Sequence, residues 1–288
     1  MEDFTIHSKY VDPLTDFGFK WLFFNELNKD LLINFLNEII REEGLVTDIR
    51  YLPPEQLGYS EKERRAVFDI FCTNEKGEYF VVEMQRAKQP YFRDRSIFYA
   101  SLPVRRQAPK GSWNFCLKAV YLVAILDFVL FNEFEEDKEQ VIEHIHLVRE
   151  RTKTVYSRKL NFVFVELPKF RKPVEELSTN TDNWLFSLKN LSTLEGRPPE
   201  VQGKIFEKLF KSMEIERLTV EDMEAYKKSV LEYRDVRDSV EYAREEGREE
   251  GREQRNIAIA RKCLKKNMSI DDIIDLTGLP EEQILKLK

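Results

Sequence analysis

A continuous apolar segment near the middle of the chain limits the architectures that this sequence can adopt. Residues Lys118 to Phe128, KAVYLVAILDF, are aliphatic and β-branched, without alternation of polar and apolar positions. Such a strand is typical of the interior of a parallel or mixed sheet, because both of its faces must be covered. The wider apolar run from Ala119 to Phe131 is too short to cross a membrane and contains Asp127. We therefore expect an α/β protein with no membrane segment.

Two shorter strands are predicted just before this segment, and each carries one acidic residue. RRAVFDIFCTN contains Asp69 and EYFVVEMQRAK contains Glu83, with the polar turn NEKGE between them, so the two runs predict a β-hairpin. A carboxylate in an apolar strand costs free energy unless it is paired, hydrogen-bonded or bound to a metal. Two of them on adjacent strands can converge on one Mg²⁺, which favours metal-assisted phosphodiester hydrolysis. The alternative is structural pairing with Arg64, Arg65 or Arg86.

Helical and strand patterns surround this hairpin. The expected elements before it are a helix beginning near Thr15 or Asp16, a helix over KDLLINFLNEII and a strand over Leu45–Pro53. The expected elements after it are a helix from Pro90 to about Arg106, strands over Glu143–Glu150 and Asn161–Phe170, and a helical cap from about residue 181 to Tyr233. Together they predict a mixed sheet flanked by helices within a domain of residues 1–234.

The sequence changes character at about Asp235, and residues 235–288 form a predicted C-terminal helical appendage. YAREEGREEGREQR is nearly repetitive, and its Glu–Arg neighbours one turn apart offset the helix-weakening Gly247 and Gly251. This segment predicts a solvated helix or a connector, with a partner-binding helix as the alternative. The last part predicts three short helices, which suit either a DNA-reading helix-turn-helix or, as we favour, a docking module because its third helix starts with two acids.

Charge is unevenly distributed along the chain. The net charge is −6, yet the stretch from Arg86 to Lys118 holds eight basic residues and only one acidic residue, Asp94. This stretch follows the Glu83 strand directly, so it is either a phosphate-contacting rim or a solvated helix face. The three cysteines are far apart, and Cys72 and Cys116 lie in apolar surroundings. We expect buried free thiols and a cytoplasmic location.

Asp69 and the run Glu83-Met84-Gln85 resemble the signature of the PD-(D/E)xK nucleases, with Gln85 where that signature has Lys. The segments DPLTDFGFKWLFF, LLINFLNEII and YLVAILDFVLF, with the Glu-Gly-Arg run, resemble one bacterial branch, the recombination-promoting nucleases or transposases. The resemblance implies a restriction-endonuclease-like mixed sheet with flanking helices. It also implies a Mg²⁺- or Mn²⁺-dependent DNA endonuclease linked to recombination or transposition. The alternative is a catalytically weak or inactive protein that binds nucleic acid or a partner.

The resemblance also implies roles for individual residues. Asp69, Glu83 and the backbone carbonyl after Glu83 would hold the metal, with Asp16 as a further ligand or a helix cap. Gln85 would orient water or phosphate, and Lys20 would supply the missing positive charge or pair with Asp16. The candidate nucleic-acid contacts are Arg86, Arg93, Arg95, Tyr99, Arg105 and Arg106. DNA is the expected partner, and a homodimer is left open.

Overall fold

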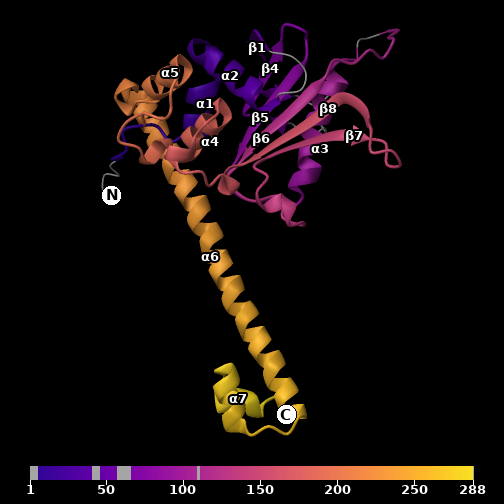
Figure 1. Cartoon of the computed structure of the whole chain (residues 1–288), viewed down its shortest axis with the longest axis vertical. Coiled ribbons are helices and arrows are strands. Elements are labelled where there is room, and N and C mark those ends of the chain that lie inside the picture. The colour runs from indigo at the N-terminus through magenta and orange to yellow at the C-terminus, as the bar shows by residue number, and fades with distance from the viewer. Residues whose placement is uncertain (1–5, 41–45, 57–65, 109–110, 288) are drawn as a thin grey trace. The chain divides into compact units, whose positions relative to one another are not determined.

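The computed structural model describes residues 6–40, 46–56, 66–108 and 111–287 (Figure 1). Contacts divide the chain into two compact units, Met1–Tyr233 and Arg234–Lys288. The first unit is built on a six-stranded sheet. Its strands are β1 (Ile49–Tyr51), β4 (Ile70–Asn74), β5 (Tyr79–Gln85), β6 (Val120–Leu126), β8 (Val155–Glu166) and β7 (Ile142–Val148), in that spatial order. A separate pair joins β2 (Glu55–Gln56) to β3 (Ala66–Val67).

The predicted central strand is β6, which is fully buried along its length. It lies between β5 and β8 and is parallel to both, with Glu83 opposite Ala124 and Val123 opposite Val163. The outer pairs β1–β4, β4–β5 and β7–β8 are antiparallel. The sheet is therefore mixed, as the sequence predicted. Its centre, β5–β6–β8, is parallel, and antiparallel strands flank this centre on both sides.

Helices cover both faces of the sheet (Figure 1). One face carries Phe80, Val82 and Met84 and belongs to the same core as α1 (Asp16–Phe23), α2 (Lys29–Ile40), α4 (Asn180–Asn190) and α5 (Lys204–Ser212). The opposite face packs with α3 (Phe92–Arg106). Side chains along a strand alternate between faces, so Glu83 and Gln85 lie on the α3 side with Val81. This placement of β5 decides what can surround the Glu83 carboxylate.

The hairpin differs from the expectation in one respect that matters for the site. The sequence places Asp69 within the first strand, but β4 begins at Ile70 and Asp69 lies in a bend between β3 and β4. The short strand β3 pairs with β2 instead of extending β4, which breaks the ladder just before Ile70. The bend frees the Asp69 backbone N–H from the sheet ladder. Cys72 is buried as expected, whereas Cys116 is exposed because it lies outside any strand, before β6.

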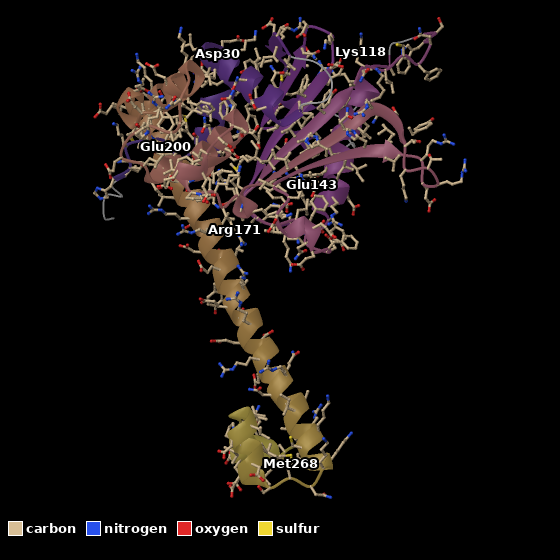
Figure 2. All side chains as sticks on the ribbon, viewed as in Figure 1. Asp30, Lys118, Glu143, Arg171, Glu200 and Met268 are labelled. Carbon is tan, nitrogen blue, oxygen red and sulfur yellow. The ribbon has the colours of Figure 1, made fainter. Side chains whose placement is uncertain are left out.

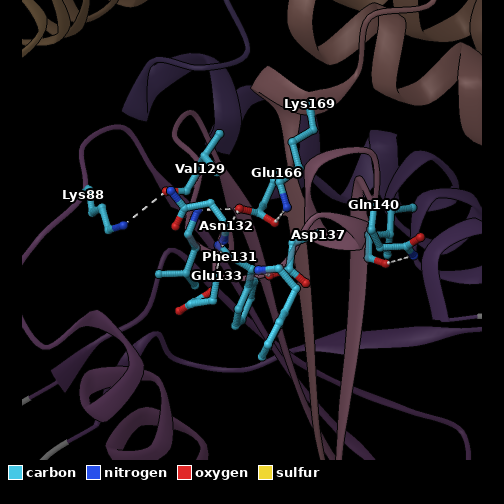
Figure 3. A network of polar contacts seen from close by, with 12 residues as sticks. Lys88, Val129, Phe131, Asn132, Glu133, Asp137, Gln140, Glu166 and Lys169 are labelled. Carbon is cyan, nitrogen blue, oxygen red and sulfur yellow. Dashed lines mark hydrogen bonds and ion pairs between the residues drawn. The ribbon is translucent and has the colours of Figure 1, made fainter.

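A buried ion pair closes the end of the central strands. Glu166, the last residue of β8, accepts hydrogen bonds from the backbone N–H groups of Leu130 and Phe131 (Figure 3). Its other oxygen accepts from Nζ of Lys169 at 2.5 Å, and both charged side chains are at most 3% exposed. The charges are paired and hydrogen-bonded, which offsets the cost of burying them. The result fixes the segment that follows β6 against the end of β8.

The C-terminal residues contain α6 (Val220–Lys265), α7 (Ile270–Thr277) and α8 (Glu281–Leu285). The sequence predicts three short helices here, but the first is the end of the long helix α6, which continues through the Glu-Gly-Arg run. Ser269 caps α7 as expected, and Gly278 ends it at φ 68°. Ala260, Cys263, Ile273, Leu279 and Ile284 form a small separate core. Among the helices described, none is both long and apolar enough to cross a membrane.

Candidate metal centre and nuclease site

Asp69 and Glu83 hold each other through reciprocal hydrogen bonds. The backbone N–H of Asp69 donates to Oε1 of Glu83 at 3.2 Å, and the backbone N–H of Met84 donates to Oδ2 of Asp69 at 2.8 Å. The bend before β4 therefore faces the middle of β5. Two carboxylates from different elements are brought together as the sequence predicted, and each is oriented by the backbone of the other.

Burial disfavours ionisation of both acids. The Glu83 side chain is only 5% exposed. Burial, together with the neighbouring Asp69 charge, raises the pKa of Glu83 to about 8, against the hydrogen bond from the Asp69 N–H and the charge of Arg95. Burial also raises the pKa of Asp69, against the hydrogen bond from the Met84 N–H. A bound divalent cation would favour the ionised form of both acids, because its positive charge offsets the two adjacent negative charges.

Arg95 is the cation of α3 that reaches the site. Its guanidinium lies 3.7 Å from Oε2 of Glu83 and donates to Oε1 of Gln89 at 2.7 Å. The ring of Tyr99 lies one helical turn further on, with its centroid 5.0 Å from the guanidinium carbon. Arg95 and Tyr99 thus share one helix face, as the sequence predicted, and Arg95 is the one that lies against Glu83. The side chain of Gln85 also contacts Glu83 and lowers its pKa through a hydrogen bond.

The other basic residues of this stretch have separate surroundings. Arg93 pairs with Glu133 and stacks over Phe131. Arg106 stacks over Phe71, and Arg105 is exposed in the last turn of α3. Arg86 stacks over Tyr233 with its guanidinium carbon 5.4 Å from the ring centroid. Of the six predicted nucleic-acid contacts, Arg95 thus lies against Glu83, and Tyr99 contacts Arg95.

Helix α1 contributes Asp16 and Lys20 to the electrostatic surroundings of Asp69. Nζ of Lys20 lies 2.9 Å from a carboxylate oxygen of Asp16, and each side chain is about half exposed. Lys20 lowers the pKa of Asp69 and Asp16 raises it, so both charges act on the site. The N-cap is Thr15, whose hydroxyl accepts from the Gly18 N–H. Asp16 is therefore a first-turn acid and ion-pair partner, not the cap.

The backbone packing around Gly18 leaves no space for a side chain at this position of α1. A Cβ atom on Gly18 would lie 1.9 Å from the backbone oxygen of Asp12 and 2.8 Å from Oγ1 of Thr15. The chain entering α1 folds back onto the helix, since the Thr15 hydroxyl donates to the same Asp12 oxygen at 2.7 Å. Any side chain at this position would displace the backbone that positions Asp16 and Lys20.

The sequence reasoning missed a polar cluster on the other face of the sheet, at the same end of β5 and β6. Tyr233 donates to Oδ2 of Asp127 at 2.8 Å, and the Asp127 N–H donates to the Gln85 carbonyl at 2.9 Å. Burial raises the pKa of Asp12, with Asp127 adding to the effect and Arg86 opposing it. The available signal was Asp127 itself, an acid at the end of an apolar strand. This cluster ties the first turns of α6 to the strand that carries Glu83 and Gln85.

The two carboxylates of Asp69 and Glu83 suit a hard divalent cation that takes only a few of its ligands from the protein. The two converging groups are carboxylates, and Mg²⁺ is usually held by one or two carboxylates with waters or phosphate oxygens completing its shell. Within the described ranges, no group of three or more His, Cys, Asp or Glu side chains is gathered as a metal cage. Glu38 instead accepts hydrogen bonds from Asn180 and Thr181 and joins α2 to α4.

A mixed sheet with one carboxylate before β4 and a second in Glu-x-Gln on β5 defines a PD-(D/E)XK nuclease fold. A model of the PD-(D/E)XK nuclease family transposases matches residues 13–243, and the chain belongs to that family. A search of the curated proteins and a search of the solved structures each found no match. The family makes this a nuclease-type protein related to transposition, with DNA as the implied substrate. Enzymes of this class generally use divalent metals.

Proposed function

We propose that this protein is a Mg²⁺- or Mn²⁺-dependent DNA endonuclease that acts in recombination or transposition. The observation that carries the proposal is the reciprocal hydrogen bonding of Glu83, a buried carboxylate, with Asp69, a partly buried one in the bend before β4. Burying a carboxylate is costly for stability, and neighbouring carboxylates with shifted pKa values are characteristic of functional sites. Membership of the nuclease family supplies the substrate class.

In this proposal Asp69, Glu83 and the backbone carbonyl of Met84 hold the metal. A bound divalent ion would supply Lewis-acid stabilisation of phosphate charge and a water that ionises more readily. The protein contributes two carboxylates in fixed positions, and it shields the Glu83 side chain from solvent. Asp16, which acts on Asp69 through its charge, is kept as a candidate for an outer position rather than as a direct ligand.

Three side chains assist the carboxylates. Gln85 projects from the same face of β5 as Glu83 and donates hydrogen bonds to water or to a phosphate oxygen. Arg95 is held next to Glu83 and stabilises negative charge on the scissile phosphate. Lys20 provides a second positive charge from α1. Arg93, Arg105, Arg106 and Tyr99 extend the contact along α3 to the phosphate backbone, and Arg86 contributes through its position after β5.

The competing function is nucleic-acid or partner binding without efficient cleavage. Gln85 cannot carry the positive charge of a lysine, and Lys20 already pairs with Asp16 at 2.9 Å. A protein of this kind would bind DNA and cut it slowly. As part of either function we propose a cytoplasmic bacterial protein, which suits its three free cysteines, and self-association through the C-terminal helices.

A plasmid-cleavage assay distinguishes these functions. The wild-type protein is incubated with supercoiled plasmid and Mg²⁺, Mn²⁺ or Ca²⁺, beside Asp69→Ala and the matched control Glu143→Ala. Glu143 is a partly buried strand carboxylate whose pKa is also raised by burial, but it lies on β7. Nicking or linearisation by the wild type and the control, with none by Asp69→Ala, supports the endonuclease. Plasmid binding without cutting in any metal would favour the binding function instead.

A further inference from the structure

Two adjoining hollows run alongside α1. The first, of about 510 Å³, lies between α1 and the first turns of α6, and Asp16, Lys20 and Lys228 are among its lining residues. The second, of about 370 Å³, lies toward the end of α5 and includes Lys208, Lys211 and Arg217 in its lining. Trp21 and Asn25 line both hollows, so the two hollows adjoin. We call them together the α1 groove.

The α1 groove is cationic on a chain that is acidic overall. Its lining contains five basic side chains and two acidic ones, against a net charge of −6 for the whole protein. Several of these cations have exposed acidic neighbours, such as Asp30, which is labelled in Figure 2 and pairs with Lys208. Exposed ion pairs contribute little to stability, so a phosphate can replace the acidic partner at low cost. The charge of the groove therefore suits a polyanion.

An aromatic side chain forms the junction of the two hollows. Trp21 stacks on Phe17, with ring centroids 5.6 Å apart and an interplanar angle of 16°. Its indole N–H donates to the carbonyl of Ser212 at 3.0 Å, which fixes the ring between α1 and α5. Phe24, also in the lining, is 39% exposed. Fixed aromatic rings beside cations are the features that bind unstacked bases and their phosphates.

Asp16 and Lys20 line the first hollow of the groove, and their charges also act on Asp69. A base pair keeps both of its bases within the duplex stack, whereas a single strand can present bases to an aromatic ring. We propose that the α1 groove binds single-stranded nucleic acid, with bases against Trp21 and phosphates along Lys228, Lys208 and Lys211. This inference rests on the proposed nuclease function and specifies the form of its substrate.

Binding is tested without metal, so that no cleavage intervenes. Fluorescence anisotropy in EDTA measures the affinity of the full-length protein for a fluorescent twelve-nucleotide oligo-dT and for a twelve-base-pair duplex, over a range of salt concentrations. The groove variant is Lys211→Gln with Lys228→Gln, one change in each hollow. The matched control is Lys153→Gln with Lys159→Gln, two exposed lysines near the β7–β8 turn. A third variant, Trp21→Leu, removes the aromatic ring, with thermal unfolding as its check.

The expected result is tighter binding of oligo-dT than of the duplex. The groove variant should bind oligo-dT about fivefold to tenfold more weakly, with a salt dependence lower by about 0.7 for each lost phosphate contact. The control should match the wild type, and a folded Trp21→Leu variant should bind about tenfold more weakly, as base stacking predicts. Equal binding by groove variant, control and wild type would overturn the inference, as would a preference for duplex that the groove variant retains.

The two proposals fail separately. If the wild type binds oligo-dT through the groove but never cuts plasmid, the groove stands and the nuclease proposal fails. If Asp69→Ala abolishes cutting while the groove variant binds and cuts like the wild type, the nuclease stands and the groove does not bind the substrate.

Discussion

The Asp69 backbone N–H lies 3.2 Å from a carboxylate oxygen of Glu83 and donates a hydrogen bond to it. The next residue on β5, Met84, returns a hydrogen bond to the Asp69 carboxylate at 2.8 Å. The two acids are thus locked to each other through the backbone, and neither can turn away without leaving an unpaired buried group. This fixed pair is what the following predictions test.

Asp69 and Glu83 are expected to bind one metal ion together. Calorimetric titration with Mn²⁺ should show binding to the wild type that Glu83→Ala and Asp69→Ala each abolish. The control Glu143→Ala should retain it, because that acid lies on β7, away from the pair. Binding that survives in Glu83→Ala would contradict a shared site. Loss of stability in both variants, with no metal binding in the wild type, would make the acids structural.

Stability without metal should fall as the pH rises toward 8. The ordinary pKa of Glu83 is 4.5, and burial with the Asp69 charge raises it to about 8 in the folded protein. Between these values the unfolded chain has lost this proton and the folded chain keeps it, so each step up in pH favours unfolding. Above pH 8 this contribution is constant. Urea unfolding in EDTA from pH 5 to 9 should show the slope in the wild type.

The same titration provides an internal control and a metal test. Glu83→Gln cannot ionise, so its unfolding free energy should vary less with pH over this window. Mn²⁺ affinity of the wild type should increase up to about pH 8, since the ion competes with the Glu83 proton. An identical pH slope in wild type and Glu83→Gln would show that Glu83 does not titrate in this range.

Gln85 is expected to contribute a hydrogen bond to the reaction. Gln85→Ala should lower plasmid cleavage by about 10²–10³, the usual cost of removing a donor to developing negative charge. Gln85→Lys should preserve or raise it, because lysine adds a positive charge at the same position. Cleavage rates are measured at saturating Mn²⁺ so that altered metal affinity does not intervene. Equal rates in all three proteins would exclude Gln85 from catalysis.

Gly18→Ala should destabilise the first unit. The added methyl group would lie 1.9 Å from the Asp12 carbonyl, so the backbone entering α1 must move. Overpacking of this kind typically costs about 1–3 kcal/mol. The matched control is Gly247→Ala, where an added Cβ would meet nothing within 4 Å beyond its own helix, and alanine has the higher helix propensity. A Gly18→Ala variant as stable as the wild type in urea would show that the segment relaxes without cost.

Truncation after Tyr233 should leave a folded core that retains any metal-dependent cleavage. The compact first unit ends at this residue, and its hydroxyl still donates to Asp127. Tyr233→Phe in the full chain should lose about 1 kcal/mol of stability through that hydrogen bond. The wild type, the truncated protein and Tyr233→Phe are compared for folding by circular dichroism, for oligomeric mass by light scattering and for activity by plasmid cleavage. A folded, metal-binding core that cannot cut would show that the C-terminal unit contributes to the site.

Local patterns in the sequence were sufficient for the sheet and for the choice of the two acids. The unbroken apolar run of β6 requires cover on both faces, and Gly77 with its polar neighbours specifies the turn of the β4–β5 hairpin. Asp69 and Glu83 stand out because carboxylates are costly in apolar strands. Thr15 was identifiable as an N-cap candidate from the same local chemistry.

How those residues meet groups distant in sequence depends on the tertiary packing. The bend at Asp69 follows from the pairing of β3 with β2, a long-range choice that no local propensity encodes. Arg86 and Arg95 are equally basic in the sequence, yet one stacks on Tyr233 and the other approaches Glu83, because they lie on different faces and elements. The α1 groove combines α1, α5 and α6, and its charge depends on their packing. Sequence patterns specify local conformation and burial, whereas the meeting of distant side chains depends on how whole elements pack.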